Sequence, residues 1–342
     1  MNRYLTTENT EGHRDNRNSK IYNEHMDGLI VIDKPAGMTS HDVVARVRNI
    51  VAERRVGHTG TLDPFATGVL VVLVGRATRL AQYLSGAEKE YEAVIRLGYA
   101  TDTGDVTGKR LECKEDFTTE TQSSTEIHQE EIESALVSLR GEIEQIPPMY
   151  SAKKVGGRKL YELARRGEEV ERKPVRVIIS SFEVIAHDGP LLARNDDGSH
   201  DLKARVVCSA GTYIRTLAED FGRRLGLGAH LAALQRTRAG RFTIADALSL
   251  ERLSELAESA KIGLALMSPD AAISHLPAVS VSADDVSRTV HGIDLQIADE
   301  QASDWPDGQP VRMRDSDGDL VAVGIYDEGR KTLHPRVVMT NE

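Results

Sequence analysis

A loop punctuated by glycines runs directly into a continuous apolar strand, and this pair constrains the fold of the chain most. Residues 57–68 contain three glycines and a proline but no apolar periodicity, which predicts a tightly specified loop. Residues 69–74 form an unbroken apolar run, typical of a buried strand. Asp63 is the single carboxylate of the loop, and Pro64 restricts its backbone to extended conformations. The pattern therefore predicts a carboxylate that a rigid loop holds in a fixed direction, and catalytic groups often lie on such loops.

Asp63 also has a purely structural interpretation, because Asp-Pro pairs commonly stabilise turns. His58, five residues earlier, suggests a second metal ligand, but the loop holds no third ligand and a metal site has little support. A P-loop and a Gly-x-Ser-x-Gly nucleophile elbow are both absent from the sequence. Catalysis by Asp63 and capping of a turn both stay open at this point.

The length of 342 residues is enough for a large core and predicts two domains. No apolar run approaches the ~20 residues that a membrane-spanning helix needs, and the N-terminus has no signal-peptide core. The two cysteines, Cys113 and Cys208, form no spaced pair, which argues against a disulfide framework and a zinc site. We therefore expect a cytoplasmic protein without a membrane partner.

The net charge of -10 is unevenly distributed along the chain. Residues 111–146 hold ten acidic and two basic side chains, whereas residues 151–176 hold nine basic and four acidic ones. Residues 203–242 are also basic, with eight basic and two acidic side chains. Basic clusters in an acidic chain indicate a local footprint for a polyanion, although solvated helix faces would give the same pattern.

Periodicity and turn residues predict an alternation of strands and helices. Strands are expected at 28–33, 69–74, 89–97, 175–186, 202–209 and 231–237, and helices at 40–54, 77–84, 130–139, 159–166, 214–225 and 250–260. Residues 1–26 read as a disordered tail, 111–127 as an acidic connector and 194–201 as a hairpin tip. We expect one domain over 27–266 and a second, small β-rich domain over 267–342, in which residues 277–339 are expected to be all-β.

Arg215 and Tyr91 are the other candidates for chemistry. Arg215 lies in the first turn of its expected helix, where an arginine is usually a surface residue; the alternative is a buried partner that holds a carboxylate ionised. Tyr91 lies on an alternating strand, where core packing is common; the alternative is a platform on which a base stacks. The residues alone do not decide between these alternatives.

The loop around Asp63 resembles the signature of the TruB family of tRNA pseudouridine synthases. Further motifs follow in that family's order: Lys34-Pro35-x-Gly37-x-Thr39-Ser40, Asp102-Thr103-Gly104-Asp105, Met149-Tyr150-Ser151-Ala152-Lys153-Lys154, Gly211-Thr212-Tyr213-Ile214-Arg215, Gly228-Ala229-His230-Leu231 and Arg236-Thr237. Together they cover residues 28–250. Several long motifs in the right order identify the chain as a member of this family.

The resemblance implies an α/β protein of the α+β type: a mixed, mainly antiparallel sheet with flanking helices, and a small PUA-like C-terminal domain that binds RNA. It implies isomerisation of uridine 55 in the T-arm loop of tRNA without cofactor or metal. We also expect a monomer without an obligate protein partner. Asp63 would be the nucleophile, Arg215 its ion-pair partner and Tyr91 the stacking residue. The substrate-binding residues would be His58, Lys34, Tyr213, Leu234, Lys153 and Lys154.

Three points stay open from the sequence. Asp63 would attack C1′, attack C6, or assist proton loss from the ribose. A non-catalytic RNA-binding module and a hydrolase using His58 and Asp63 are the competing functions. The longer tail, the tip at residues 194–201 and the loosely matching C-terminal segment depart from the family pattern.

Overall fold

The computed structural model describes residues 26–340 except 112–127, 152, 165, 169, 187–189 and 299. The expected tail, up to residue 25, and the acidic connector, from residue 112, lie outside the described residues.

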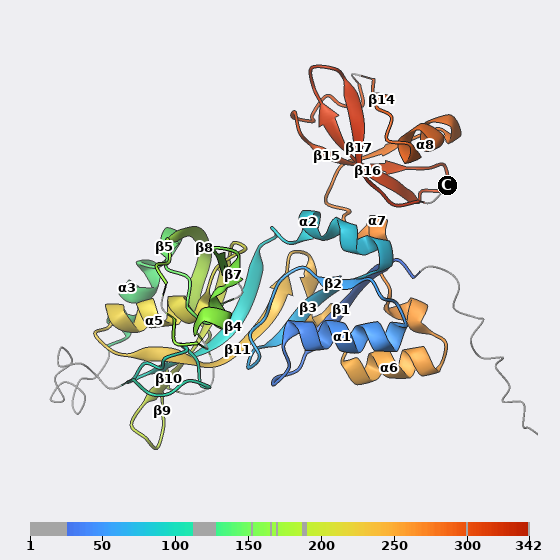
Figure 1. The fold of residues 1–342 in the computed structure, drawn as a ribbon. Coiled ribbons are helices and arrows are strands. Elements are labelled where there is room, and N and C mark those ends of the chain that lie inside the picture. The colour runs from blue at the N-terminus through green and yellow to red at the C-terminus, as the bar shows by residue number, and fades with distance from the viewer. Residues whose placement is uncertain are drawn as a thin grey trace, which may run out of the picture.

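A ten-stranded sheet forms the main body (Figure 1). Its path runs β1 (Gly28–Lys34), β3 (Thr67–Val74), β11 (Ala229–Ala239), β4 (Lys89–Leu97), β10 (His200–Cys208), β8 (Val175–Val184) and β5 (Gly141–Gln145). Three short strands, β2 (Val56–His58), β9 (Ala193–Arg194) and β12 (Phe242–Thr243), pair with β3, β10 and β11. Only β3 and β11 run parallel to each other among these pairs, so the expected mixed, mainly antiparallel sheet is confirmed.

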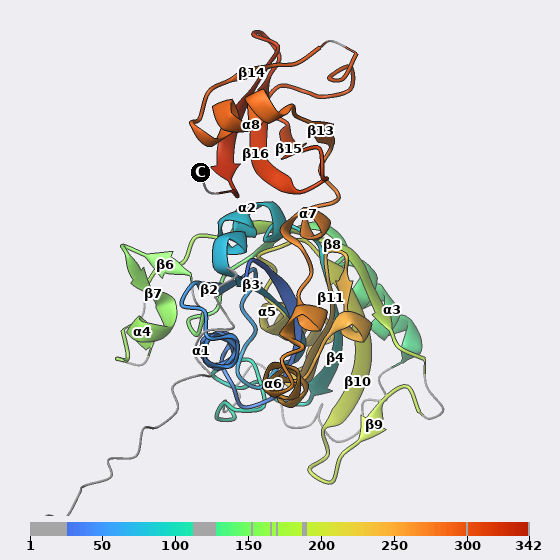
Figure 2. The same ribbon diagram turned by 90° about the vertical axis from the view of Figure 1, so that its right-hand side faces the viewer.

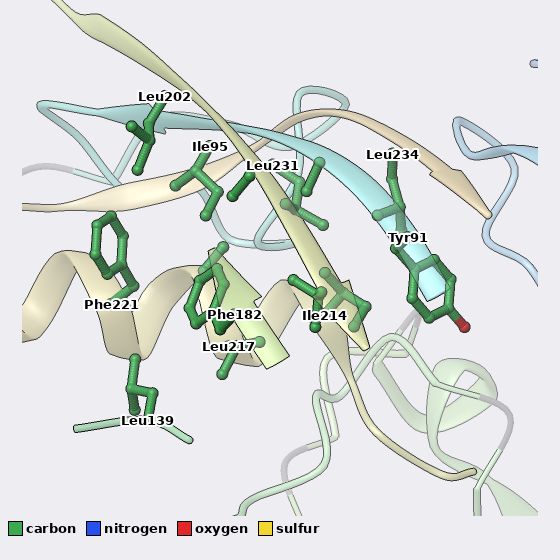
Figure 3. Close-up of a cluster of buried hydrophobic side chains, with 14 of the residues drawn as sticks. Tyr91, Ile95, Leu139, Phe182, Leu202, Ile214, Leu217, Phe221, Leu231 and Leu234 are labelled. Atoms are coloured by element: carbon green, nitrogen blue, oxygen red, sulfur yellow. The ribbon is translucent and has the colours of Figure 1, made fainter. Parts of the chain in front are cut away.

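Two pairs of helices cover different parts of the sheet. α3 (Gln129–Val137) and α5 (Ile214–Arg224) pack on the half formed by β4, β10, β8 and β11, where Phe182 meets Phe221 edge-on with ring centroids 5.7 Å apart (Figure 3). α1 (Ser40–Val51) and α6 (Leu250–Glu258) cover β1 and β3. The valines of α1 recur on one stripe and are buried, because residues three and four apart share a helix face.

Local signals place the ends of several elements. Thr39 caps α1 by accepting a hydrogen bond from the amide of Asp42, and the carboxylate of Asp42 accepts one from the amide of Thr39 in return. The expected helix at 77–84 is a 3₁₀ turn, η1 (Gly75–Leu80), followed by α2 (Ala81–Leu84). A hairpin turn joins β6 (Lys154–Val155) to β7 (Arg158–Lys159) and leads into α4 (Leu160–Ala164). In Figure 2 these three elements stand apart from the main sheet.

The C-terminal part forms a second sheet, above the main body in Figures 1 and 2. It comprises β13 (Ala278–Ser280), β15 (Pro310–Arg314), β16 (Leu320–Asp327), β17 (Thr332–Val338) and β14 (Leu295–Gln296). The expectation of an all-β domain is wrong, because α8 (Ala283–Val290) lies against this sheet. Ser282 caps α8, and the two aspartates of its first turn favour a helix N-terminus here.

The second sheet packs directly on the main body. Leu320, Val337 and Met339 share one buried cluster with Leu29 of β1 and Leu80 of η1. Two short elements, η3 (Ile262–Ala265) and α7 (Pro269–Ala272), lead from α6 to the second sheet; η2 (Ile244–Asp246) precedes α6. α2 and α7 lie between the two parts in both views (Figures 1 and 2). In the part of the chain described here, no helix is both long and apolar enough to cross a bilayer.

Candidate active site

The Asp63 loop is fastened to the turn that follows β1. Lys34 is fully buried, and its ammonium donates to the carbonyl oxygens of Pro35 (2.8 Å), Met38 (2.6 Å) and Pro64 (3.2 Å). The hydroxyl of Ser40 accepts the amide of Leu62 at 2.9 Å. The Lys34–Ser40 segment thus holds the loop on both sides of Asp63.

Asp63 forms a bidentate ion pair with Arg215 at the start of α5. The Nε of Arg215 lies 2.8 Å from Oδ2 of Asp63, and its Nη2 donates to Oδ1 at 3.0 Å. The Arg215 side chain is 5% exposed and that of Asp63 is 32% exposed, so the arginine lies behind the carboxylate. The alternatives of a surface arginine and of a turn-capping carboxylate are therefore wrong, because the two side chains are directed at each other.

The other donors of Arg215 are held by the surrounding backbone. Its Nη1 donates to the carbonyl of Thr103 at 2.9 Å and its Nη2 to that of Tyr150 at 2.7 Å. A second buried carboxylate, Asp105, has its Oδ2 3.8 Å from Nη1. Burial raises the pKa of Asp63; Arg215 opposes that rise, and the like charge of Asp105 adds to it.

A cavity of about 340 Å³ opens beside this ion pair. Asp63, Arg215, Tyr91 and Leu234 all line it. In Figure 3 Tyr91 lies at one end of the core cluster, and its hydroxyl points away from the other labelled side chains. Tyr91 thus belongs to the core, as its position on an alternating strand suggests, and it also lines the cavity; its role as a stacking platform stays a prediction. A larger hollow, about 760 Å³, lies at the other end of β4 and is lined by none of the expected site residues.

Two buried cations that line the cavity, Lys89 and Arg236, were not among the site residues expected from the sequence. Lys89 precedes Tyr91 by two residues on β4, and the alternation of that strand places both on the buried face. This alternation was the signal that would have found Lys89. Burial, with the charge of Arg236 adding to it, lowers the pKa of Lys89 to about 8.

The remaining expected site residues differ in whether they line the cavity. Lys153 and Tyr213 line the cavity. Lys34 and His58 are absent from its lining: Lys34 supports the loop, and the Nδ1 of His58 accepts the amide of Gly60 at 3.3 Å while its ring meets that of His41 edge-on. The side chain of Lys154 lies outside the described part of the chain. Among the described residues, no three His, Cys, Asp or Glu side chains are grouped to hold a metal ion.

A carboxylate held by a buried arginine at the edge of a cavity with an aromatic wall is typical of enzyme active sites, which makes this cavity the candidate site. The family model "TruB family pseudouridylate synthase (N terminal domain)" matches residues 48–214, and "tRNA pseudouridylate synthase B C-terminal domain" matches residues 215–268. This chain belongs to the TruB family of pseudouridylate synthases and is an isomerase.

Similar proteins agree with this assignment over most of the chain. The "tRNA pseudouridine synthase B" of Geobacter sulfurreducens is 42% identical over 90% of this chain and 98% of its own length. The protein of the same name from Mycobacterium leprae is 44% identical over 90% and 91%. Among solved structures, a Cbf5-Nop10-Gar1 complex contains a chain that matches with a TM-score of 0.65 and 27% identity, over 92% of this chain and 84% of that one.

Proposed function

We propose that this enzyme converts uridine 55 in the T-arm loop of tRNA into pseudouridine, with Asp63 as the catalytic carboxylate. The observation that carries the proposal is the ion pair of Asp63 with a buried arginine at the edge of a cavity walled by Tyr91. Relatives covered almost end to end carry the name tRNA pseudouridine synthase B, which supports tRNA as the substrate.

The reaction rearranges bonds within one nucleotide. The target base leaves the stack of the loop, which costs a few kcal/mol, and enters the cavity. The bond between C1′ and N1 breaks, the base turns, and C5 bonds to C1′; C5 loses a proton and N1 gains one. An ionised Asp63 can hold a covalent intermediate at C1′ or C6, or take a proton from the ribose, and all three roles need the charged form that Arg215 favours.

The decisive experiment is an incubation of the protein with unmodified tRNA followed by nucleoside analysis. We expect pseudouridine at position 55, and none in a matched transcript that carries cytidine there. Tight binding of tRNA without product would instead support the RNA-binding module. Turnover of a small phosphoester or ester with no effect on tRNA would support the hydrolase.

Recognition of the tRNA backbone is assigned to the basic segment around the β6–β7 hairpin. Lys153 lines the cavity and Arg158 is exposed. The second basic stretch, 203–242, contributes less than its composition suggests, because Arg215 and Arg238 bind carboxylates and Arg236 binds backbone carbonyls. We also propose that the C-terminal sheet adds affinity for RNA, and that the enzyme acts as a cytoplasmic monomer without an obligate partner.

Lys153→Glu combined with Arg158→Glu should weaken tRNA binding and flatten its dependence on salt. Each phosphate contact that is lost should reduce the steepness of log K, the association constant, against log salt concentration by about 0.7–0.9, because fewer counterions are released. Filter binding at several salt concentrations measures both quantities. Lys261→Glu, after α6, is the matched charge reversal outside the segment. If the salt dependence of the Lys153→Glu/Arg158→Glu variant equalled that of the Lys261→Glu variant, the hairpin would not be part of the tRNA interface.

Tyr91→Leu should weaken capture of the base, because stacking on an aromatic ring contributes ~1–3 kcal/mol per base. Tyr91→Phe keeps the ring and isolates the hydroxyl, whose pKa burial raises. We expect a large defect in the Leu variant and a smaller one in the Phe variant, measured as the rate of pseudouridine formation with excess enzyme. Equally mild effects of both substitutions would argue against a role for Tyr91 in the reaction.

As the pH is lowered, the rate of pseudouridine formation should fall at a higher pH than it would if Asp63 had the pKa of an ordinary aspartate. The pKa of Asp63 is raised above the usual value of about 3.9, so the carboxylate takes up a proton earlier as the pH falls. Asp105→Asn removes a like charge and should move the midpoint of this acid limb to lower pH. Single-turnover rates across the acidic range, with folding followed by circular dichroism, test both statements. A midpoint at or below the ordinary value would contradict them.

A further inference from the structure

Arg236 lies between the two strands that carry the proposed nucleophile loop and the proposed stacking residue. On one side it stands opposite Gly68 in the parallel pairing of β11 with β3, the strand into which the Asp63 loop runs. On the other side it stands opposite Tyr91 in the antiparallel pairing of β11 with β4. One residue of β11 therefore touches both halves of the site.

The guanidinium of Arg236 binds the loop at both of its ends. The side chain lines the cavity and the residue is 2% exposed. Its Nε donates to the carbonyl of Val69 at 2.7 Å, and its Nη2 donates to the carbonyl of Gly60 at 3.1 Å. Gly60 precedes Asp63 by three residues and Val69 follows it by six, so the fork of the arginine spans the base of the loop.

The backbone of Arg236 also fixes the end of the loop. Gly68 has a φ of +96°, and a Cβ at that position would lie 2.2 Å from the carbonyl oxygen of Arg236. A side chain at position 68 would be strained twice, by this close approach and by the left-handed backbone. The end of the loop therefore lies close against the main chain of Arg236, whose side chain hydrogen-bonds the same loop.

A register shift explains why Arg236, and not the next arginine of the strand, enters the site. The pairing of β11 with β4 slips between Arg236 and Arg238. Residues two apart on a regular strand share a face, and such an irregularity re-aims the following side chain. Arg238 turns instead to the carboxylates of Glu88 and Glu90, at 2.9 and 3.5 Å.

We propose that Arg236 is a positioning residue that fixes the Asp63 loop relative to Tyr91, and that base isomerisation depends on this fixation. The inference rests on the proposed function. Although Arg236 also lines the cavity, its guanidinium hydrogen-bonds the loop backbone, and we assign its role to holding the loop. Lysine cannot reproduce this arrangement, because its one ammonium nitrogen replaces the two separate nitrogens, Nε and Nη2, that the rigid guanidinium directs at the carbonyls of Val69 and Gly60.

Arg236→Lys is expected to lower the single-turnover rate at saturating tRNA about 10²-fold, since a displacement of about 1 Å costs a factor of that size. Affinity for tRNA should stay close to that of the unsubstituted enzyme, because the loop is displaced and not removed. Arg238→Lys, two residues along the same strand, is the matched control and should keep the unsubstituted rate. Thermal denaturation of each variant separates loss of folded protein from loss of rate.

A second variant provides a readout that a merely structural role would not move. Arg236→Ala leaves a hole at the base of the loop, and added methylguanidinium should restore part of the rate. The proposal is overturned if Arg236→Lys and Arg238→Lys react equally fast, or if the rate per folded molecule of Arg236→Lys is unchanged. Both results require that the unsubstituted enzyme forms pseudouridine. Absence of pseudouridine from the unsubstituted enzyme would overturn the proposed function itself.

Discussion

Asp63→Asn should abolish pseudouridine formation in a single turnover and leave tRNA affinity nearly unchanged. Asparagine has the size of aspartate and tolerates the restriction that Pro64 imposes, but an amide is no nucleophile and no base. The buried Arg215 keeps a counter-charge in this variant, because Asp105 lies 3.8 Å from its Nη1. The loss of folding free energy should therefore stay within the ~1.5–3 kcal/mol of a charged hydrogen bond.

The measurements are pseudouridine yield with excess enzyme, filter binding of the same tRNA, and thermal denaturation. Asp201→Asn is the matched control, because Asp201 forms an equally bidentate pair with Arg96 (2.7 and 2.8 Å) away from the cavity. Substantial product from Asp63→Asn would end its assignment as the catalytic carboxylate. Weak binding with an intact rate would move Asp63 to the recognition surface.

Arg215→Met should lower both the rate and the stability, and its loss of stability should be the largest among the substitutions of the site. It leaves Asp63 and Asp105 close together without their shared cation, and breaking a buried pair in this way costs about 3–5 kcal/mol. The pKa of Asp63 should rise further, because Arg215 is the main influence that opposes the rise caused by burial. At a given pH a smaller fraction of Asp63 would then be ionised, and the single-turnover rate should fall accordingly.

Arg215→Lys keeps the charge and separates the two effects. Lysine cannot serve the carboxylate and the carbonyls of Thr103 and Tyr150 together, so a reduced rate with smaller loss of stability is expected. Arg96→Lys supplies the matched control at the Asp201 pair. If the acid limb of Arg215→Met coincided with that of the unsubstituted enzyme, Arg215 would have no influence on the protonation of Asp63.

Local patterns determined much of the fold. The strand at 89–97 follows directly from alternation, because its inward side chains are buried and its outward ones are not. The start of α1 follows from the Thr39 cap. Among the elements that escaped this reasoning, β5 carries exposed glutamates and lacks a clear period, and α8 lies in a stretch of Asp and Gly that also suits turns.

The sequence by itself determined which family the chain belongs to and which residues to examine. Asp63 and Arg215 stand in motifs that can be recognised from the sequence alone, and the family resemblance adds Tyr91. Only the tertiary structure decided what lies around them. The support of the loop by Lys34 and its fastening by Arg236 join residues 30 and 176 positions apart along the chain. Such contacts depend on which strands become neighbours, and no local period encodes that choice.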